Sequence, residues 1–112
     1  MSYKIVPTHN FEKALKRLAK KHRSIKEDVG ELGELLEDNP TMGDKVIENC
    51  YKIRIAITSK NKGKSGGARI ITYIYVAQET VFLLSIYDKS EHENISNHEL
   101  KVLIDSLGLE ET

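Results

Sequence analysis

The chain has 112 residues, 39% of them apolar and 30% charged, and a formal net charge of zero at pH 7. These values are typical of one folded domain over residues 1–112, and they exclude a disordered chain and a second sizeable core. No apolar run approaches the roughly 20 residues that cross a bilayer, and the N-terminal residues lack the apolar stretch of a secretory signal. Cys50 is the single cysteine, which excludes an internal disulfide and a cysteine metal cluster. We therefore expect a protein of the reducing cytoplasm.

The first half of the chain predicts a short strand followed by two helices. Residues 2–6 read as a strand that a proline ends. Apolar side chains at helical spacing predict a helix over about 10–22, with lysines on its other face. Ser24 and Glu27 fit a capping box, and a second apolar stripe then continues to about residue 38, before an Asn-Pro pair that disfavours helix. The short joint between the two helices indicates an αα-hairpin.

The second half predicts strands. Residues 45–47 are a brief extended piece, and residues 51–58 alternate strictly between isoleucine and other side chains. Residues 68–77 are β-branched and aromatic. Residues 81–87 alternate little, which favours a central strand buried on both faces. The short connections between the last three predict an antiparallel meander.

A last helix closes the predicted fold. Ser96 or Asn97 caps it, it runs over roughly 98–107, and Gly108 ends it. The expected order is therefore β-α-α-β-β-β-α, an α+β domain without repeats.

The net charge of zero hides four blocks of alternating sign. Residues 13–26 carry seven basic and no acidic side chains, and residues 49–78 carry six basic and none acidic. Acids dominate residues 27–48, eight against one lysine, and residues 79–112, eight against two. A polyanion can bind both basic blocks if the fold brings them to one face.

The stretch NKGKSGGARII, residues 61–71, has three interpretations. A phosphate-binding P-loop is disfavoured, because it needs a glycine where Thr58 stands and a helix where a strand is expected. A flexible hairpin turn with solubilising lysines is the simplest interpretation. Against it, the loop is long, its charges have one sign, and Lys52, Arg54 and Arg69 flank it. This concentration of cations is typical of a site for a phosphate backbone.

Several stretches together resemble a known family. They are "FEKALKRLAKKH", "YKIRIAI", "GKSGGARIITY" and "LLSIYDKSEHENIS", and they stand in the family's order over nearly the whole chain. With them the sequence resembles the RelE/ParE superfamily of bacterial toxins, and within it the HigB-like RelE branch. The resemblance implies a small antiparallel sheet with two N-terminal helices packed on it and a short C-terminal helix.

The resemblance also implies a function. RelE-type members are ribosome-dependent endoribonucleases that cut mRNA, need no metal or cofactor, and are held inactive by an antitoxin encoded beside them. For the HigB-like branch the expected antitoxin is a HigA-like helix-turn-helix protein, and the expected target is the ribosome with its mRNA. Two alternatives stay open, because fold does not settle function: a ParE-type inhibitor of DNA gyrase, and an inactive member that only binds its antitoxin.

The site residues carried over from the family are basic. Arg54, Arg69 and Lys89 match its strand and strand-end cations, which would bind the scissile phosphate and stabilise its extra charge. A tyrosine that several members have near the position of Ile95 is absent. The general acid and base are therefore unassigned, and His92 is a low-ranking catalytic candidate; Tyr87, Lys89 and Glu93 are the others.

The remaining lysines of this region are expected to contact the RNA backbone and to set affinity and not chemistry. They are Lys52, Lys60, Lys62 and Lys64. Structural interpretations compete with these roles: Arg54 can pair with Asp88, and Lys89 with Asp88 or Glu91, as ordinary ion pairs. Tyr73 and Tyr75 fit core packing better than base stacking.

Overall fold

The computed structural model describes residues 2–91 and 94–109 of the chain. Its helices and strands are β1 (Lys4–Pro7), α1 (His9–Ala19), α2 (Ile25–Asp38), β2 (Asp44–Ile47), β3 (Cys50–Ile55), β4 (Ala68–Tyr75), β5 (Thr80–Asp88) and α3 (Asn97–Asp105). Short 3₁₀ turns lie at Thr58–Lys60 (η1), Lys64–Gly66 (η2) and Val76–Gln78 (η3). Within the described ranges, no helix is long and apolar enough to cross a membrane.

The strands form one five-stranded sheet in the order β1-β5-β4-β3-β2. The α+β class is confirmed, and β5 is an interior strand, paired on both sides, although β4 is the central one. The extended piece at 45–47 is also confirmed, and as β2 it adds a strand to the expected order. The expectation of a purely antiparallel sheet is wrong, because β1 runs parallel to β5 while the other neighbours are antiparallel. A four-residue edge strand pairs through its backbone, so its side chains carry little information about its direction.

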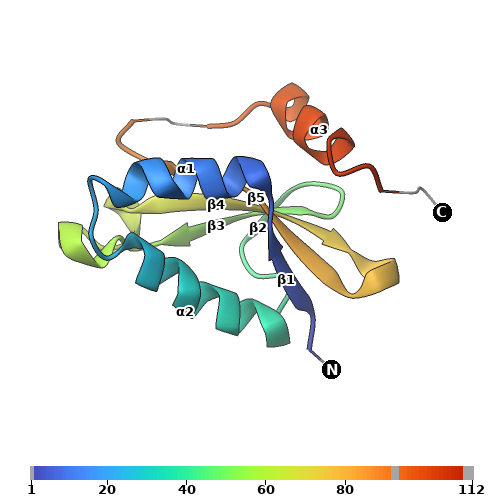
Figure 1. Cartoon of the computed structure of the whole chain (residues 1–112), viewed down its shortest axis with the longest axis horizontal. Helices are drawn as coiled ribbons and strands as arrows, with labels where there is room; N and C mark the ends of the chain where they lie inside the picture. Colours follow the sequence, from blue (N-terminus) through green and yellow to red (C-terminus); the bar gives the residue numbers. More distant parts are fainter. Residues whose placement is uncertain (1, 92–93, 110–112) are drawn as a thin grey trace.

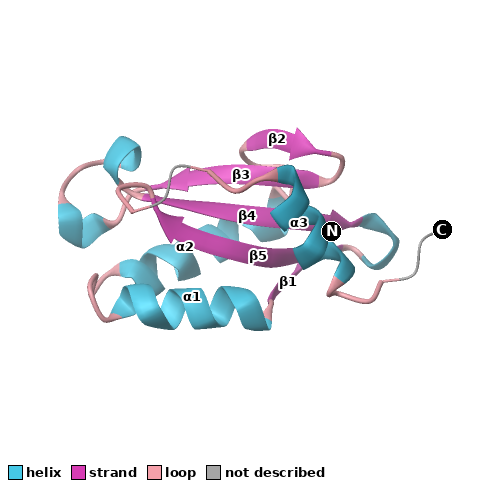
Figure 2. Cartoon of the chain, turned by 90° about the horizontal axis from the view of Figure 1, so that it is seen from above, coloured by secondary structure: helices cyan, strands magenta, loops and turns pink. Residues whose placement is uncertain are grey.

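Helices cover both faces of the sheet. Helices α1 and α2 pack on one face through a cluster that includes Phe11, Leu18 and Ile70. Helix α3 packs on the other face through Leu100, in a smaller cluster with Ile71. Figure 2 shows α3 in front of the sheet and α2 behind it, and Figure 1 shows how α1 and α2 follow each other along the chain. Because neighbouring residues of a strand point to opposite faces, Ile70 and Ile71 supply different cores.

The helix ends follow local side-chain chemistry. The Thr8 hydroxyl accepts the Phe11 N–H at the start of α1. At α3, Ser96 and Glu99 form the full capping box, which confirms one of the two expected caps. The α1 helix ends at Ala19, earlier than expected, because the chain leaves it in a tight turn.

The capping box expected for Ser24 and Glu27 is wrong. Ser24 has helical backbone angles and makes no side-chain cap hydrogen bond. Its hydroxyl instead donates to Asp28 Oδ2 (2.9 Å) and accepts the N–H of Ser59 (2.9 Å). The Ser24 hydroxyl, which the local sequence predicted to cap α2, therefore accepts a hydrogen bond from Ser59, a residue distant in the sequence.

Candidate functional site

A row of polar side chains crosses the sheet on the face that carries α3. Arg69 of β4 stands opposite Arg54 of β3 on one side and Tyr87 of β5 on the other. Lys52 lies two residues from Arg54 and so shares its face. Its Nζ donates to Asn94 Oδ1 (3.2 Å), in the segment that leads from β5 to α3. Register thus brings together residues that lie far apart in the sequence.

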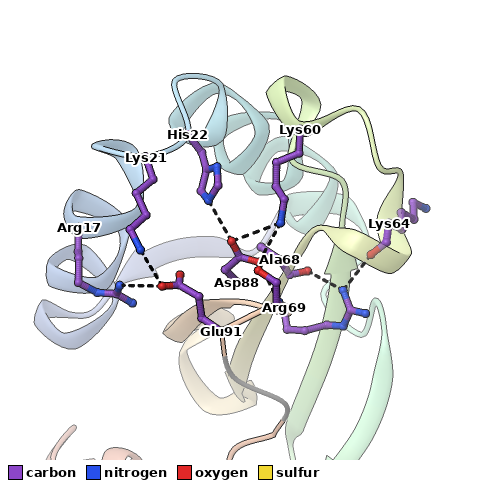
Figure 3. Close-up of polar contacts among 10 residues, drawn as sticks. Arg17, Lys21, His22, Lys60, Lys64, Ala68, Arg69, Asp88 and Glu91 are labelled. Atoms are coloured by element: carbon purple, nitrogen blue, oxygen red, sulfur yellow. Dashed lines mark hydrogen bonds and ion pairs between the residues drawn. The ribbon is translucent and has the colours of Figure 1, made fainter.

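The two arginines of the row differ in exposure. Arg54 is exposed, whereas Arg69 is only 4% exposed. Arg69 Nη1 donates to the carbonyl oxygens of Lys64 (2.9 Å) and Ala68 (3.1 Å), which ties the η2 turn to the start of β4 (Figure 3). Arg54 is therefore the arginine that a ligand can reach directly, and Arg69 places a fixed positive charge beside it.

Tyr87 completes the row. Its ring is buried, and burial raises the pKa of its phenol above the ordinary value of 10, while the positive charge of Arg69 partly opposes this shift. The phenol therefore stays protonated at neutral pH, and its hydroxyl oxygen is itself buried, so it does not face a ligand directly. Cys50, on another part of the same face, is fully buried, and burial raises the pKa of its thiol to about 11. This makes Cys50 a poor nucleophile.

The long loop between β3 and β4 is docked and not a free turn. Asp28 of α2 accepts hydrogen bonds from the Thr58 N–H (3.0 Å) and hydroxyl (2.6 Å). At its other end the backbone of Gly67 lies against the carbonyl of Ile55, so closely that a Cβ there would collide with it. Lys62 and Lys64 are exposed on the loop. Both ends of the connection are therefore held against the rest of the fold, and the exposed lysines lie between them.

A buried carboxylate, Asp88, lies at the end of β5 next to this row. Asp88 Oδ1 accepts from Lys60 Nζ (3.1 Å) and from the Ser90 hydroxyl (2.8 Å) and N–H (3.0 Å), and Oδ2 lies 2.9 Å from His22 Nε2. Burial opposes ionisation, but the hydrogen bonds from Ser90, Lys60 and His22 outweigh it and lower the pKa of Asp88 to about 2. Asp88 is therefore an anion at any physiological pH.

Lys89 follows this carboxylate and is exposed. The acids that were expected to pair with it are occupied by other cations: Asp88 by Lys60 and His22, and Glu91 by Lys21 Nζ (2.8 Å) and Arg17 Nη1 (3.9 Å). Within the described residues, Lys89 forms no ion pair. Its exposed side chain, in the turn that follows β5, is thus not engaged by these acids.

Both the sequence and the fold match known proteins. Residues 3–106 match the family model described as "RelE toxin of RelE / RelB toxin-antitoxin system". The chain belongs to the RelE toxin family. Its fold is similar to solved structures of the E. coli RelE toxin. One is a double arginine-to-alanine mutant in the free state, with a TM-score of 0.61 and 15% sequence identity over 96% of this chain and 99% of that one. Another is the isolated toxin, with a TM-score of 0.54 and 20% identity over 94% of this chain and 99% of that one. A third is the same mutant in complex with an antitoxin RelBc peptide, with a TM-score of 0.55 and 19% identity over 100% of this chain and 99% of that one.

In this RelE-family chain the expected site residues fall into three groups. Register brings Arg54, Arg69 and Lys52 together, and Lys89 is exposed beside them. Lys62 and Lys64 extend from the adjoining loop, whereas the side chain of Lys60 is 15% exposed and bound to Asp88. His92 lies outside the described residues.

The described residues contain no group of three or more His, Cys, Asp or Glu side chains that could hold a metal ion. Tyr73 packs against the second core cluster, as expected.

The sequence predicted Arg54 or Lys89 as ion-pair partners of Asp88, and the structure gives it His22 and Lys60 instead. An acid at the end of an apolar strand, between a tyrosine and a lysine, is the one available signal. Its partners, His22 and Lys60, are 66 and 28 residues away, so local sequence holds no trace of them.

Proposed function

We propose that this chain is the toxin of a toxin-antitoxin pair and that it cleaves mRNA on the ribosome. The observation that carries the proposal is the cross-strand row of Arg54, Arg69 and Tyr87, with Lys89 exposed beside it. Membership of the RelE family supports the same activity. Neighbouring cations on one face of the sheet suit a reaction that develops negative charge on a phosphate.

The reaction is attack of a ribose 2′-hydroxyl on the adjacent phosphorus. The 2′-oxygen loses its proton and forms the new P–O bond, the bond to the 5′-oxygen breaks, and the leaving oxygen takes up a proton. The products are a 2′,3′-cyclic phosphate and a 5′-hydroxyl. Arg54 and Lys89 would bind the phosphate oxygens, and Arg69, next to Arg54 on the neighbouring strand, would stabilise the added negative charge. The chemistry as written involves no metal or cofactor.

The flanking lysines have a different task in this proposal. Lys52, Lys62 and Lys64 would contact RNA backbone phosphates and set affinity. We assign Lys60 to holding the loop, because its ammonium is bound to Asp88. The general acid and base are unassigned, and His92 remains part of the proposal as the candidate proton-transfer group.

The proposed partners are the ribosome with its mRNA and a cognate antitoxin. A related toxin has been solved with an antitoxin peptide, and the GKSGGAR motif favours a HigB-like toxin with a helix-turn-helix, HigA-like antitoxin. Binding of the antitoxin would cover the cationic row or block entry to the ribosome.

Expression of the chain alone in a bacterial host tests the proposal. We expect translation to stop within minutes and new mRNA 5′ ends to appear inside translated codons. Arg54→Ala and Lys89→Ala, two changes at exposed positions, should each lower cleavage at least about ten-fold, and the buried Arg69→Ala at least as much. Lys101→Ala, an exposed lysine on α3, is the matched control. Growth arrest with intact mRNA and altered plasmid supercoiling would instead support gyrase inhibition, and no arrest would support a chain that only binds its antitoxin.

A further inference from the structure

The carboxylate of Asp88 accepts hydrogen bonds from side chains in three different segments of the chain. Lys60 comes from η1 in the loop between β3 and β4, His22 from the turn between α1 and α2, and Ser90 from the turn that follows β5. The carboxylate residue is 3% exposed, and Figure 3 shows its contacts converging from separate parts of the fold. A buried anion with this many donors cannot be moved without leaving several of them unpaired.

The position of Asp88 in its strand places it directly behind the cationic row. Tyr87 belongs to the row, so the next residue points to the opposite face, which α1 and α2 cover. Asp88 stands opposite Ala68, the residue before Arg69. The Lys89 N–H donates to Gly67 O (3.0 Å), which joins the end of β5 to the start of β4. Tyr87 is therefore on the site side, the backbone of Lys89 is joined to Gly67 just before β4, and the Asp88 side chain is anchored on the opposite face.

The acids of this turn also determine which cations remain available. Asp88 neutralises Lys60, and Glu91 binds Lys21 and Arg17. Lys89 lies between these two acids in the sequence but pairs with neither. The buried contacts of Asp88 thus hold the turn, the exposed pairs of Glu91 contribute little, and Lys89 forms no ion pair within the described residues.

We propose that Asp88 is a positioning residue for RNA cleavage: from the face covered by α1 and α2 it holds Lys89 and the loop between β3 and β4 in place around Arg69. This inference rests on the proposed function. Asp88 does not contact the substrate in this scheme. It acts through the backbone of residues 88–91 and through Lys60, and a displacement of about 1 Å in a phosphate-binding group is enough to lower a rate about 100-fold.

Asp88→Asn is the informative substitution, because it keeps the size of the side chain. The amide oxygen can still accept both hydrogen bonds from Ser90. The amide nitrogen then stands where Oδ2 was, beside His22 and Lys60, and the ammonium of Lys60 loses its counter-charge. Asp38→Asn changes the net charge equally at an exposed residue at the end of α2 and is the matched control. Glu91→Gln removes a second acid of the same turn, one whose exposed pairs contribute little.

The test measures single-turnover cleavage of mRNA on programmed ribosomes, with the purified full-length chain. For Asp88→Asn we expect the rate constant at saturation to fall at least about ten-fold while the half-saturating concentration changes less than about two-fold. Asp38→Asn and Glu91→Gln should stay within about two-fold of wild type in both. A purely structural role would lower the fraction of active protein, and hence the amplitude, and leave the rate constant unchanged.

Amide hydrogen exchange supplies a readout that does not need activity. The Lys89 N–H should lose protection in Asp88→Asn, while amides in the middle of β5 keep theirs. A wild-type rate constant or unchanged Lys89 protection in Asp88→Asn would overturn the proposal. If wild type itself cleaves nothing, the proposed function fails together with the catalytic part of this inference, and the exchange data then show whether Asp88 holds the turn.

Discussion

A buried carboxylate needs several hydrogen-bond donors to stay ionised, and Asp88 has them. Hydrogen bonds from Ser90, Lys60 and His22 more than offset the cost of burial, and the pKa falls from its ordinary 3.8 to about 2. A folded-state pKa below the unfolded one stabilises the fold at any pH above the unfolded value. That contribution is lost as the pH falls from about 4 through about 2.

Acid unfolding should reveal this contribution. We expect Asp88→Asn to unfold more easily than wild type at pH 6. About 2 kcal/mol of the difference in unfolding free energy should vanish on going from about pH 5 to about pH 2, because the wild-type carboxyl becomes protonated there. Urea unfolding at a series of pH values measures this difference, and the other carboxyl groups cancel because both proteins have them. A difference that is the same at every pH would contradict the role of Asp88.

The loop between β3 and β4 shows at the scale of an element how a flexible-looking sequence becomes ordered. Its first residues bind Ser24 and Asp28 at the start of α2. Its last residue, Gly67, passes against the carbonyl of Ile55 with no room for a side chain. Arg69 closes the loop through the carbonyl of Lys64. The exposed lysines are thus carried on a framework that is fixed at both ends.

Substitution of two glycines should separate this close approach from ordinary glycine flexibility. Gly67→Ala should destabilise the protein by about 2 kcal/mol or more, because its Cβ collides with backbone atoms that cannot rotate away. Gly30→Ala in α2, whose Cβ would meet nothing within 4 Å, should stabilise it by about 0.5–1 kcal/mol through higher helix propensity. Urea unfolding midpoints measure both changes. Equal effects would show that the close approach at Gly67 is unimportant.

At the scale of the whole molecule, the fold joins the two basic blocks at one end. The end of α1 and the turn after it bring Arg17 and Lys21 to Glu91, and the loop between β3 and β4 brings Lys60 to Asp88 (Figure 3). The acids at the junction bind these cations, and Lys62, Lys64 and Lys89 are exposed around it. A chain with zero net charge thereby presents a local cationic surface to a polyanion.

Charge reversal on the loop tests the role of this surface in RNA binding. Lys62→Glu and Lys64→Glu should each weaken binding to programmed ribosomes and make its dependence on salt less steep, by about one unit of the log–log slope for each phosphate that is no longer bound. The cleavage rate at saturation should change little. Lys101→Glu, with the same charge change on α3, is the control in a salt titration of the binding constant. An unchanged slope in the loop variants would place the RNA elsewhere.

The sequence alone indicated most of the helices and strands and which side of each is buried. Alternation in residues 51–58 predicted that Ile53, Ile55 and Ile57 share a buried face, and all three lie in the first core. These patterns are readable because burial acts on every second residue of a strand and on one face of a helix. The family resemblance likewise indicated the arginines of β3 and β4 before their register was known.

Only the tertiary structure decided what those residues do together. It paired β1 in parallel with β5. It directed the Ser24 hydroxyl to Ser59 and away from capping its own helix. It buried Arg69 while leaving Arg54 exposed. It also assigned Lys60 to Asp88 and left Lys89 exposed. The strand pairing and the contacts of Ser24 and Asp88 join residues far apart in the chain. Because hydrogen bonds and ion pairs choose partners by distance in space, local sequence cannot specify them.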